Sequence, residues 1–301
     1  MKKKLLFIYN AHAGKAQIRS RLVSILDIFA KAGYETTVKP TLRQGDATDF
    51  VVEREEYFDL IVCSGGDGTL DEVVMGMMQC EKKLPLGYIP CGTTNDFART
   101  LNIPFNMIRA SYTAVEGESF LCDIGKFNRR AFVYIAAFGL FTDVSYQTKQ
   151  TMKNVLGHMA YLLEGMKHLQ AVQSYHLKVR YDGKYIEDDF VFGMVTNSIS
   201  VGGFKMITGG NVEMDDGVFE VTLIKKPKDA AEMNKILLAL TSKVIDSECM
   251  YCFKTSKISF EAPDKMPWTR DGEFGGRYQK VEIENLHKAL EIKILPKNKS
   301  F

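Results

Sequence analysis

The segment from Cys63 to Glu72, Cys-Ser-Gly-Gly-Asp-Gly-Thr-Leu-Asp-Glu, constrains the fold of this chain more than any other. It overlaps an apolar run, 59–63, that is typical of a buried parallel strand. Three glycines around Asp67 break the strand, and Thr69 stands three residues before Glu72, which is the spacing of a capping box at a helix start. The sequence therefore predicts a strand, a glycine turn and a helix N-terminus in direct succession.

Such a junction is suited to binding phosphate. Glycine lets backbone N–H groups approach phosphate oxygens closely, and the helix dipole favours negative charge at this end. Asp67 adds a carboxylate to the same turn, which makes chemical sense if Mg²⁺ lies between the carboxylate and the phosphates. A tight turn without a ligand is the alternative, but it would need much less than Gly-Gly-Asp-Gly-Thr. We therefore interpret the segment as part of a phosphoryl-transfer site.

The bulk properties are those of an ordinary globular protein with one large or two average domains. The chain has 301 residues, of which 46% are hydrophobic and 25% charged. Its net charge of +2 predicts no strong attraction to nucleic acid. The apolar run 5–9 is too short for a signal peptide, and no stretch has the length of a membrane span. We therefore expect a cytoplasmic protein.

The six cysteines do not form a metal-binding pattern. Cys249 and Cys252 make a single C-x-x-C, without the second pair or nearby histidine that a zinc site needs. We expect reduced thiols at buried strand or helix ends.

The first part of the chain alternates strands and helices. Strands are expected over 5–9, 35–39, 59–63 and 85–89, and the spacing of apolar residues between Ile18 and Phe29 predicts a helix. This order favours a doubly wound parallel sheet. Ligands of such sheets bind at the carboxyl ends of the strands. The segments that follow the strands there are 10–15, 65–69 and 92–96.

The pattern changes after about Asp123. Short strands are expected over 130–138, 175–181, 185–196 and 218–224 and from 257 onward, which together favour a β-sandwich. Two helices interrupt them, near 153–170 and 229–244. The fold class expected is therefore an N-terminal doubly wound α/β nucleotide-binding domain followed by a C-terminal β-sandwich domain.

Three further motifs carry chemically useful residues. The segment 90–97, Pro-Cys-Gly-Thr-Thr-Asn-Asp-Phe, offers hydroxyls and a carboxylate at the same sheet edge, although an N-cap turn would explain it about as well. Asp215-Asp216-Gly217 is either a hairpin turn or a hard-cation site. In Asp271-Gly-Glu273 the two carboxylates have the spacing of one strand face, so that one could bind Mg²⁺ and the other accept a proton.

Taken together, these residues resemble the diacylglycerol kinase catalytic-domain family, in particular its bacterial lipid kinases. The matching segments occur in family order and span nearly the whole chain: 8–15, 65–73, 89–97, 123–125, 215–217 and 271–273. The resemblance implies a nucleotide-binding kinase domain over 1–125, a β-sandwich domain over 126–288, and a C-terminal segment, 289–301, that can return to the first domain. It also implies ATP- and Mg²⁺-dependent transfer of a γ-phosphoryl group to a lipid hydroxyl, with a phosphatidic-acid-like product when the lipid is diacylglycerol.

The resemblance also assigns roles to single residues. It implies that Glu273 accepts the proton with Asp271 beside it, although the sequence does not separate these two roles, and that Asp67 is catalytic. Asp67, Asp96 and Asp123 would surround the catalytic Mg²⁺. A second, structural Mg²⁺ would bind the Asp216 side chain and the main-chain oxygens of Glu213 and Val218. The residues expected to hold ATP are Asn10, Ala11, His12, Ala13, Gly14, Thr41, Gly65, Gly66, Asp67, Gly68, Thr69, Leu70, Asp71, Thr93, Asn95 and Asp96.

Two positions depart from the family pattern. Asp71 stands where asparagine is usual, so that a donor is lost and negative charge is added near the nucleotide. The first loop reads Asn-Ala-His-Ala-Gly, where the family commonly has proline and serine, and the side chain of His12 is expected to face solvent.

Two other functions stay open at this point. An NAD kinase-like enzyme shares the Gly-Gly-Asp-Gly signature, but Asp271-Gly-Glu273 and the Asn95-Asp96-Phe97 segment favour the lipid kinase. A catalytically silent nucleotide-binding regulator is supported by Asp71 alone. The partner implied is a lipid at a membrane surface, reached from the cytoplasm by reversible contact with the inner face. The helix 153–170 is the candidate contact, although packing of its apolar stripe on the β-sandwich is the alternative that the pattern favours. No nucleic-acid partner is expected, and a homodimer is left open.

Overall fold

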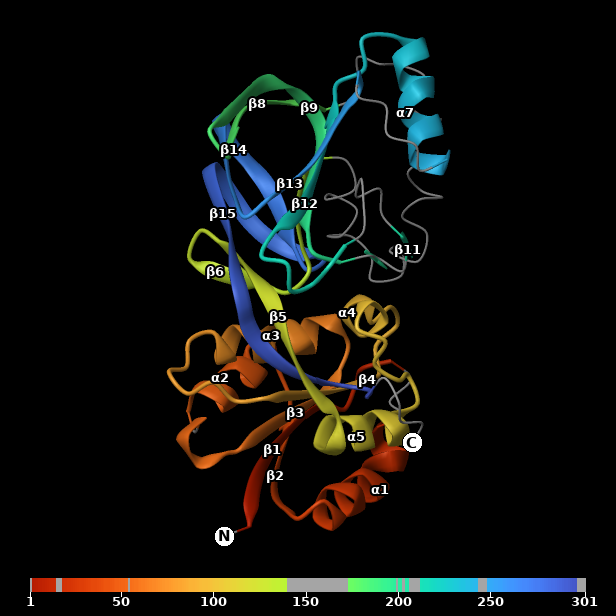
Figure 1. Cartoon of the computed structure of the whole chain (residues 1–301), viewed down its shortest axis with the longest axis vertical. Coiled ribbons are helices and arrows are strands. Elements are labelled where there is room, and N and C mark those ends of the chain that lie inside the picture. Colours follow the sequence, from red (N-terminus) through yellow and green to blue (C-terminus); the bar gives the residue numbers. More distant parts are fainter. Residues whose placement is uncertain are drawn as a thin grey trace. The chain divides into compact units, whose positions relative to one another are not determined.

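The computed structural model of the chain describes residues 2–14, 18–53, 55–139, 173–198, 200–201, 204–205, 212–242 and 248–296 (Figure 1). The helix expected over 153–170 lies outside these residues. The chain divides into two compact units: Met1–Ile124 with Lys288–Phe301, and Gly125–His287. None of the helices in the described ranges has the length and hydropathy that crossing a lipid bilayer requires.

The first unit is built on a parallel sheet with the strand order β2-β1-β3-β4. Every residue of the central strand β3 is buried, as its apolar run predicts. The last part of the long strand β15 extends this sheet, with Ile292 opposite Leu86 of β4. The strands are β1 (Lys3–Asn10), β2 (Tyr34–Thr41), β3 (Leu60–Gly65), β4 (Leu86–Pro90) and β15 (Glu273–Ile294).

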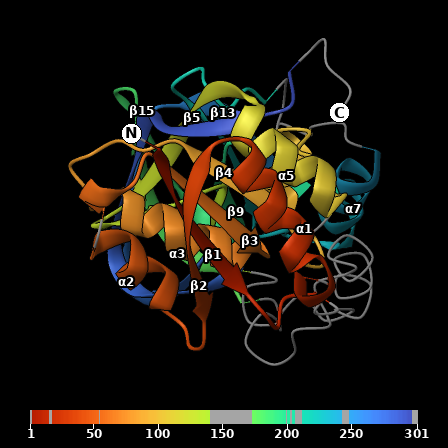
Figure 2. The same cartoon turned by 90° about the horizontal axis from the view of Figure 1, so that it is seen from below.

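Helices cover both faces of this sheet (Figure 2), because side chains alternate between the faces along each strand. Leu5 and Phe7 of β1 pack on one face with Ile25 and Phe29 of α1 and Ala110 of α5. On the other face lie α2 and α3. The doubly wound α/β domain is thereby confirmed. The helices of this unit are α1 (Ile18–Lys31), α2 (Asp46–Val52), α3 (Asp67–Met77), α4 (Asp96–Thr100) and α5 (Met107–Glu116), with a 3₁₀ turn at Glu55–Tyr57 and the strand β5 (Glu118–Phe127).

The capping box expected at Thr69 and Glu72 is wrong. The N-cap of α3 is Gly66, so that the helix begins at Asp67 and both residues lie inside it. The Glu72 carboxylate instead accepts hydrogen bonds from the backbone N–H groups of Gly45 (2.9 Å) and Ala47 (3.3 Å), at the start of α2. An acidic side chain stabilises the N-terminus of a neighbouring helix in the same way as it stabilises the N-terminus of the helix to which it belongs.

The second unit is antiparallel and β-rich, as expected. Two long strands, β9 and β14, each pair with β8 over one stretch and with β7 over another, so that the four strands close on themselves. Phe138, Phe260 and Trp268 form the aromatic centre of its core. Its elements are β6 (Arg130–Phe132), β7 (Ile135–Gly139), β8 (Tyr175–Tyr181), β9 (Lys184–Thr196), β10 (Ser200–Val201), β11 (Phe204–Lys205), β12 (Phe219–Lys225), α7 (Ala230–Ser242), β13 (Met250–Thr255) and β14 (Lys257–Arg270), followed by β15.

The continuous strand expected over 130–138 is also wrong, because it is broken between β6 and β7. The backbone N–H groups of Val133 and Tyr134, at the break, bond to a side chain instead of to a neighbouring strand. That side chain belongs to Asp271 and is described with the site below.

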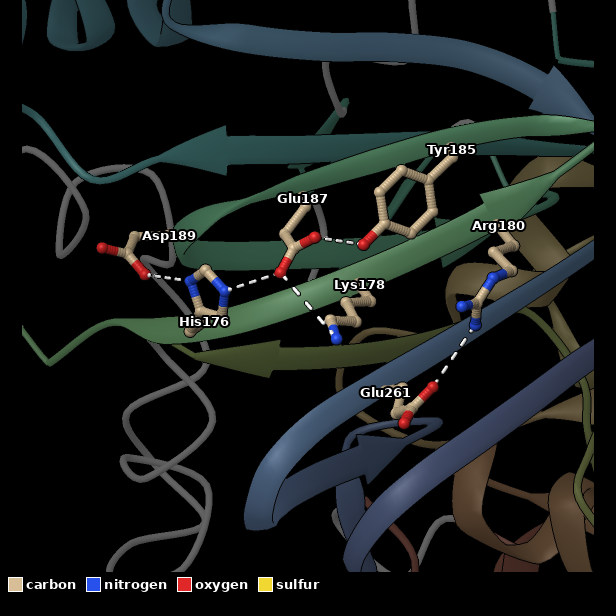
Figure 3. Close-up of polar contacts among 7 residues, drawn as sticks. All are labelled: His176, Lys178, Arg180, Tyr185, Glu187, Asp189 and Glu261. Atoms are coloured by element: carbon tan, nitrogen blue, oxygen red, sulfur yellow. Dashed lines mark hydrogen bonds and ion pairs between the residues drawn. The ribbon is translucent and has the colours of Figure 1, made fainter.

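The outer face of the β8–β9 hairpin is polar (Figure 3). Its cross-strand pairs are His176 with Asp189, Lys178 with Glu187, and Arg180 with Tyr185. His176 Nδ1 lies 2.9 Å from an Asp189 carboxylate oxygen, and this contact is the main reason that the pKa of His176 is raised. Because these side chains are exposed, water and salt screen their charges, and they fix the register more than they stabilise the fold.

Candidate active site

The loops after three parallel strands of the first unit touch each other through backbone atoms. A Cβ added to Gly92, after β4, would lie 2.5 Å from the Cα of Gly66, after β3. A Cβ on Gly14, after β1, would lie 2.1 Å from the carbonyl oxygen of Cys91, and the φ of Gly14 is +57°. Only glycine permits such close approach, and glycine adopts this left-handed conformation without the strain of a side chain. The three loops expected at the carboxyl edge are therefore brought together.

Side chains also connect these loops. The Asn10 amide at the end of β1 donates to the Thr69 hydroxyl in α3 over 3.5 Å. The Asn10 carboxamide oxygen accepts from the backbone N–H of His12 (2.9 Å), whose side chain is exposed as expected. Thr41, also predicted to hold nucleotide, is buried at the end of β2. The backbone N–H groups and hydroxyls at this edge are the donors that phosphate oxygens require.

Asp67 is the central charged group of this edge. Its Oδ2 accepts a hydrogen bond from the Thr94 hydroxyl at 3.0 Å, whereas its Oδ1 is buried and has no hydrogen-bond partner in the described part of the chain. Burial, followed by the nearby charge of Asp96, raises the pKa of Asp67 from 3.8 to about 6. Asp96 itself is fully buried at the start of α4. Two buried carboxylates with an unpaired oxygen suit a cation.

The donor set suits Mg²⁺ held partly by other ligands. Among the described residues, no group of three or more His, Cys, Asp or Glu side chains could hold a metal ion. Mg²⁺ commonly binds through one or two carboxylates together with substrate phosphates and water, which is what Asp67 and Asp96 would allow. Asp123, the third predicted ligand, is buried on β5, and its Oδ1 accepts from the backbone N–H of Lys288 at 2.8 Å.

Asn95 serves the loop that it belongs to. Asn95 has a φ of +50°. Its Oδ1 accepts a hydrogen bond from the backbone N–H of Gly92 (2.9 Å), and its Nδ2 donates one to the Gly92 carbonyl (3.1 Å). The side chain is almost completely buried. In the structure it holds the turn in shape rather than extending from it toward a nucleotide.

Tyr88 was not singled out by the sequence analysis, although it lies beneath two of the loops. It is buried in β4, and its hydroxyl is 3.2 Å from the Gly65 carbonyl and 3.3 Å from Asn95 Oδ1. One phenolic group thereby links the loop after β3 to the loop after β4. The only available signal was a polar head inside an otherwise apolar strand, which does not by itself indicate a function.

In the second unit, Asp271 and Glu273 occupy different environments. Asp271 and Gly272 form a two-residue turn between β14 and β15, with φ values of +48° and +82°. The Asp271 carboxylate accepts hydrogen bonds from the backbone N–H groups of Val133 (2.7 Å), Tyr134 (2.9 Å) and Ile135 (3.1 Å). Glu273, at the first position of β15, is exposed. Asp271 therefore anchors the turn, and its carboxylate does not have the open geometry of a metal ligand.

The residues predicted to bind a structural Mg²⁺ do not fit that ion as they are arranged. Asp216 Oδ1 accepts from the Val218 N–H at 3.2 Å, and Asp216 Oδ2 lies 3.0 Å from the ammonium group of Lys254. The Asp216 carboxylate thus already forms an ion pair with the Lys254 side chain.

Comparison with known proteins identifies the family of the chain. Residues 4–127 match the diacylglycerol kinase catalytic domain, and residues 136–294 match the YegS C-terminal NAD kinase beta sandwich-like domain. The diacylglycerol kinase of Bacillus subtilis (strain 168) is 34% identical over 300 residues, which is 99% of this chain and 98% of that protein. The chain belongs to the diacylglycerol kinase family. It is therefore a kinase, and its family acts on lipids.

Other members of the diacylglycerol kinase family show the same relation. The diacylglycerol kinase of Staphylococcus aureus (strain bovine RF122 / ET3-1) is 35% identical over 295 residues, covering 97% of this chain and 92% of that protein. A crystal structure of a diacylglycerol kinase from Bacillus anthracis str. Sterne is 25% identical and matches with a TM-score of 0.76 over 98% of both chains. A second crystal structure from that organism gives a TM-score of 0.83 at 29% identity, over 98% of this chain and 96% of the other.

Replacing Asp67 by asparagine should stabilise the free protein while removing turnover. The folded state raises the pKa of Asp67 from 3.8 to about 6, so the ionised side chain costs stability above that pH, and the cost fades as the pH falls toward 3.8. At about pH 7 the gain for Asp67→Asn should reach up to about 3 kcal/mol, and it should be smaller at about pH 5. Urea unfolding without nucleotide or divalent cation measures it.

Asp49→Asn, at an exposed position in the first turn of α2, is the matched control: it should leave turnover unchanged and should not stabilise the protein, because the charge of Asp49 favours the helix N-terminus by less than about 1 kcal/mol. A gain for Asp67→Asn that is equal at both pH values, or normal turnover in this variant, would contradict the role assigned to the carboxylate.

Replacing Tyr88 by phenylalanine should weaken nucleotide binding more than it slows chemistry. Loss of the hydroxyl leaves the Gly65 carbonyl without this donor and loosens the two loops. We expect KM for ATP to rise roughly tenfold, with a smaller change in kcat, and stability to fall by about 1–2 kcal/mol. Steady-state kinetics and urea unfolding test this, with the exposed Tyr57→Phe as control. Lower stability with an unchanged KM for ATP would show that Tyr88 stabilises the fold without supporting nucleotide binding.

Proposed function

We propose that this family member transfers the γ-phosphoryl group of ATP, with Mg²⁺, to the primary hydroxyl of diacylglycerol or a closely related lipid. The observation that carries the proposal is the buried, unpaired oxygen of Asp67 in the glycine loops, next to the fully buried Asp96. Relatives named diacylglycerol kinase over nearly the full length of the chain support the choice of lipid. The product would be a phosphatidic-acid-like lipid.

The residues of the first unit would bind the phosphates, the Mg²⁺ ion and the rest of the nucleotide. Backbone N–H groups of the loops after β1, β3 and β4 would bind the phosphates, as a helix N-terminus and glycine turns do elsewhere. Asp67 and Asp96 would hold Mg²⁺, which when bound would neutralise charge on the phosphates. Asp71, Thr93 and Thr41 remain proposed nucleotide contacts. We propose that the departure at Asp71 affects nucleotide affinity and not the class of reaction.

The acceptor hydroxyl must lose its proton as it attacks. The lipid oxygen forms a bond to the γ-phosphorus, the bond from that phosphorus to ADP breaks, and the hydroxyl proton passes to the Glu273 carboxylate. Asp271 would act as a positioning residue, because its hydrogen bonds to three backbone N–H groups fix the turn before Glu273. Because the acceptor is a lipid, we also propose that the protein works from the cytoplasm in reversible contact with the inner face of the membrane.

The direct test is incubation of the protein with γ-labelled ATP, Mg²⁺ and a total lipid extract. We expect label in a lipid that migrates as phosphatidic acid. Glu273→Gln should lower the rate by roughly a hundredfold to ten-thousandfold without changing stability. Asp271→Asn should lower stability, by about 2 kcal/mol or more, because an amide NH₂ cannot accept from these N–H groups.

The matched control is Glu282→Gln, which removes an exposed carboxylate from the same strand, where Glu282 pairs with Lys280 at 2.9 Å. It should leave the rate unchanged. Label transferred to a nicotinamide dinucleotide and not to lipid would favour the NAD kinase-like alternative. ATP binding without any turnover would favour a silent regulator, and a fully active Glu273→Gln would exclude Glu273 as the base.

A further inference from the structure

The turn before β12 is held by a lysine from the neighbouring strand. Asp216 lies in this turn, followed by Gly217 with a φ of +81°. Asp216 Oδ1 accepts from the Val218 N–H at 3.2 Å, which closes the turn locally. The other oxygen, Oδ2, lies 3.0 Å from Lys254 Nζ, an ion pair that joins residues 38 positions apart in the sequence.

The same ammonium group meets a second carboxylate. Glu220 on β12 stands directly opposite Lys254 on β13 in the strand register. Glu220 Oε1 lies 3.0 Å from Lys254 Nζ, and the Glu220 side chain is 0% exposed, against 22% for Asp216 and 38% for Lys254. One cationic nitrogen thus lies between a fully buried carboxylate and a partly exposed one.

A cation is favourable at this place. Without a partner, the buried carboxylate of Glu220 on β12 would be strongly unfavourable, and the carboxylate of Asp216 in the preceding turn would also repel it. Mg²⁺ would need about six oxygen ligands at short distance and gives up its water reluctantly. A lysine ammonium on a four-carbon stem meets the same charge demand with ordinary hydrogen-bond distances.

We propose that the Lys254 ammonium takes the place of a structural divalent cation between Asp216 and Glu220, so that the second unit needs no metal at this turn. The proposal concerns stability and does not depend on the substrate of the kinase. It differs from the expectation that Asp216 binds a structural Mg²⁺, because the carboxylate oxygens that the metal would use are engaged by Lys254 and by the Val218 N–H.

The test is thermal unfolding of the full chain, without nucleotide, after chelation and after addition of millimolar Mg²⁺. We expect chelation to cause no change in the wild-type melting temperature that depends on Asp216. Lys254→Met should lower the melting temperature by on the order of 5 °C, because it leaves two carboxylates without a cation. In this variant added Mg²⁺ or Ca²⁺ should recover part of the loss, and the double variant Lys254→Met with Asp216→Asn should not respond in this way.

Two controls separate this effect from others. Lys228→Met removes a lysine whose side chain is 85% exposed and lies 3.8 Å from Glu232, and it should not alter the melting temperature. Asp216→Asn in the wild-type background distinguishes the two candidate cation sites. A rise in melting temperature caused by Mg²⁺ at Asp67 and Asp96 would persist in this variant, whereas a rise caused by Mg²⁺ at the Asp216 turn would be lost.

Two results would overturn the proposal. In the first, chelation lowers the wild-type melting temperature and Asp216→Asn abolishes that change. In the second, Lys254→Met melts at the wild-type temperature. If Lys254→Met does not fold, the chelation experiment on the wild type and on Asp216→Asn still decides between a lysine and a metal at this position.

Discussion

Backbone-to-backbone contact between the loops after β1, β3 and β4 is the constraint on which the candidate nucleotide site depends. Gly14, Gly66 and Gly92 permit this contact, because a side chain at Gly14 or Gly92 would overlap the neighbouring loop. The same contact places Thr94 against Asp67 and removes water from one carboxylate oxygen. The close approach of the loops and the raised pKa of Asp67 therefore have a common origin. The parallel sheet beneath supplies the fixed spacing of the strand ends.

Three carboxylate arrangements among the described residues differ in how their charge is compensated. The Asp271 carboxylate is surrounded by backbone N–H groups and is a structural anchor. The carboxylates of Asp216 and Glu220 share one lysine. Within the described part of the chain, the Asp67 carboxylate keeps a buried oxygen without a hydrogen bond, and the nearby charge is that of another carboxylate, Asp96. In proteins, uncompensated charge of this kind is more often found at functional sites than at structural ones, because it lowers stability.

The sequence predicted those parts of the molecule that local patterns determine. Apolar runs identified the four parallel strands, and the glycine-rich segment predicted the junction of β3 with α3, at the edge where we propose that phosphate binds. What it missed depends on contacts between distant positions. Asp271 bonds to Val133 across 138 positions, and its effect on the 130–138 strand has no local signature. Glu72 fitted a capping box by spacing, but the N-cap of α3 is Gly66. The Glu72 carboxylate instead accepts a hydrogen bond from the backbone at the start of α2. The importance of Tyr88 appears only when the loops after β3 and β4 are seen together.

The buried Asp67 oxygen without a hydrogen bond also makes the thermal stability of this protein sensitive to the ligands that it binds. Any ligand that places positive charge against this carboxylate removes an existing penalty in addition to forming new contacts. By mass action such a ligand raises the melting temperature more than its contact area alone would suggest. Thermal shift measurements on the unliganded chain should therefore rank nucleotide and cation combinations by how well they compensate one buried charge.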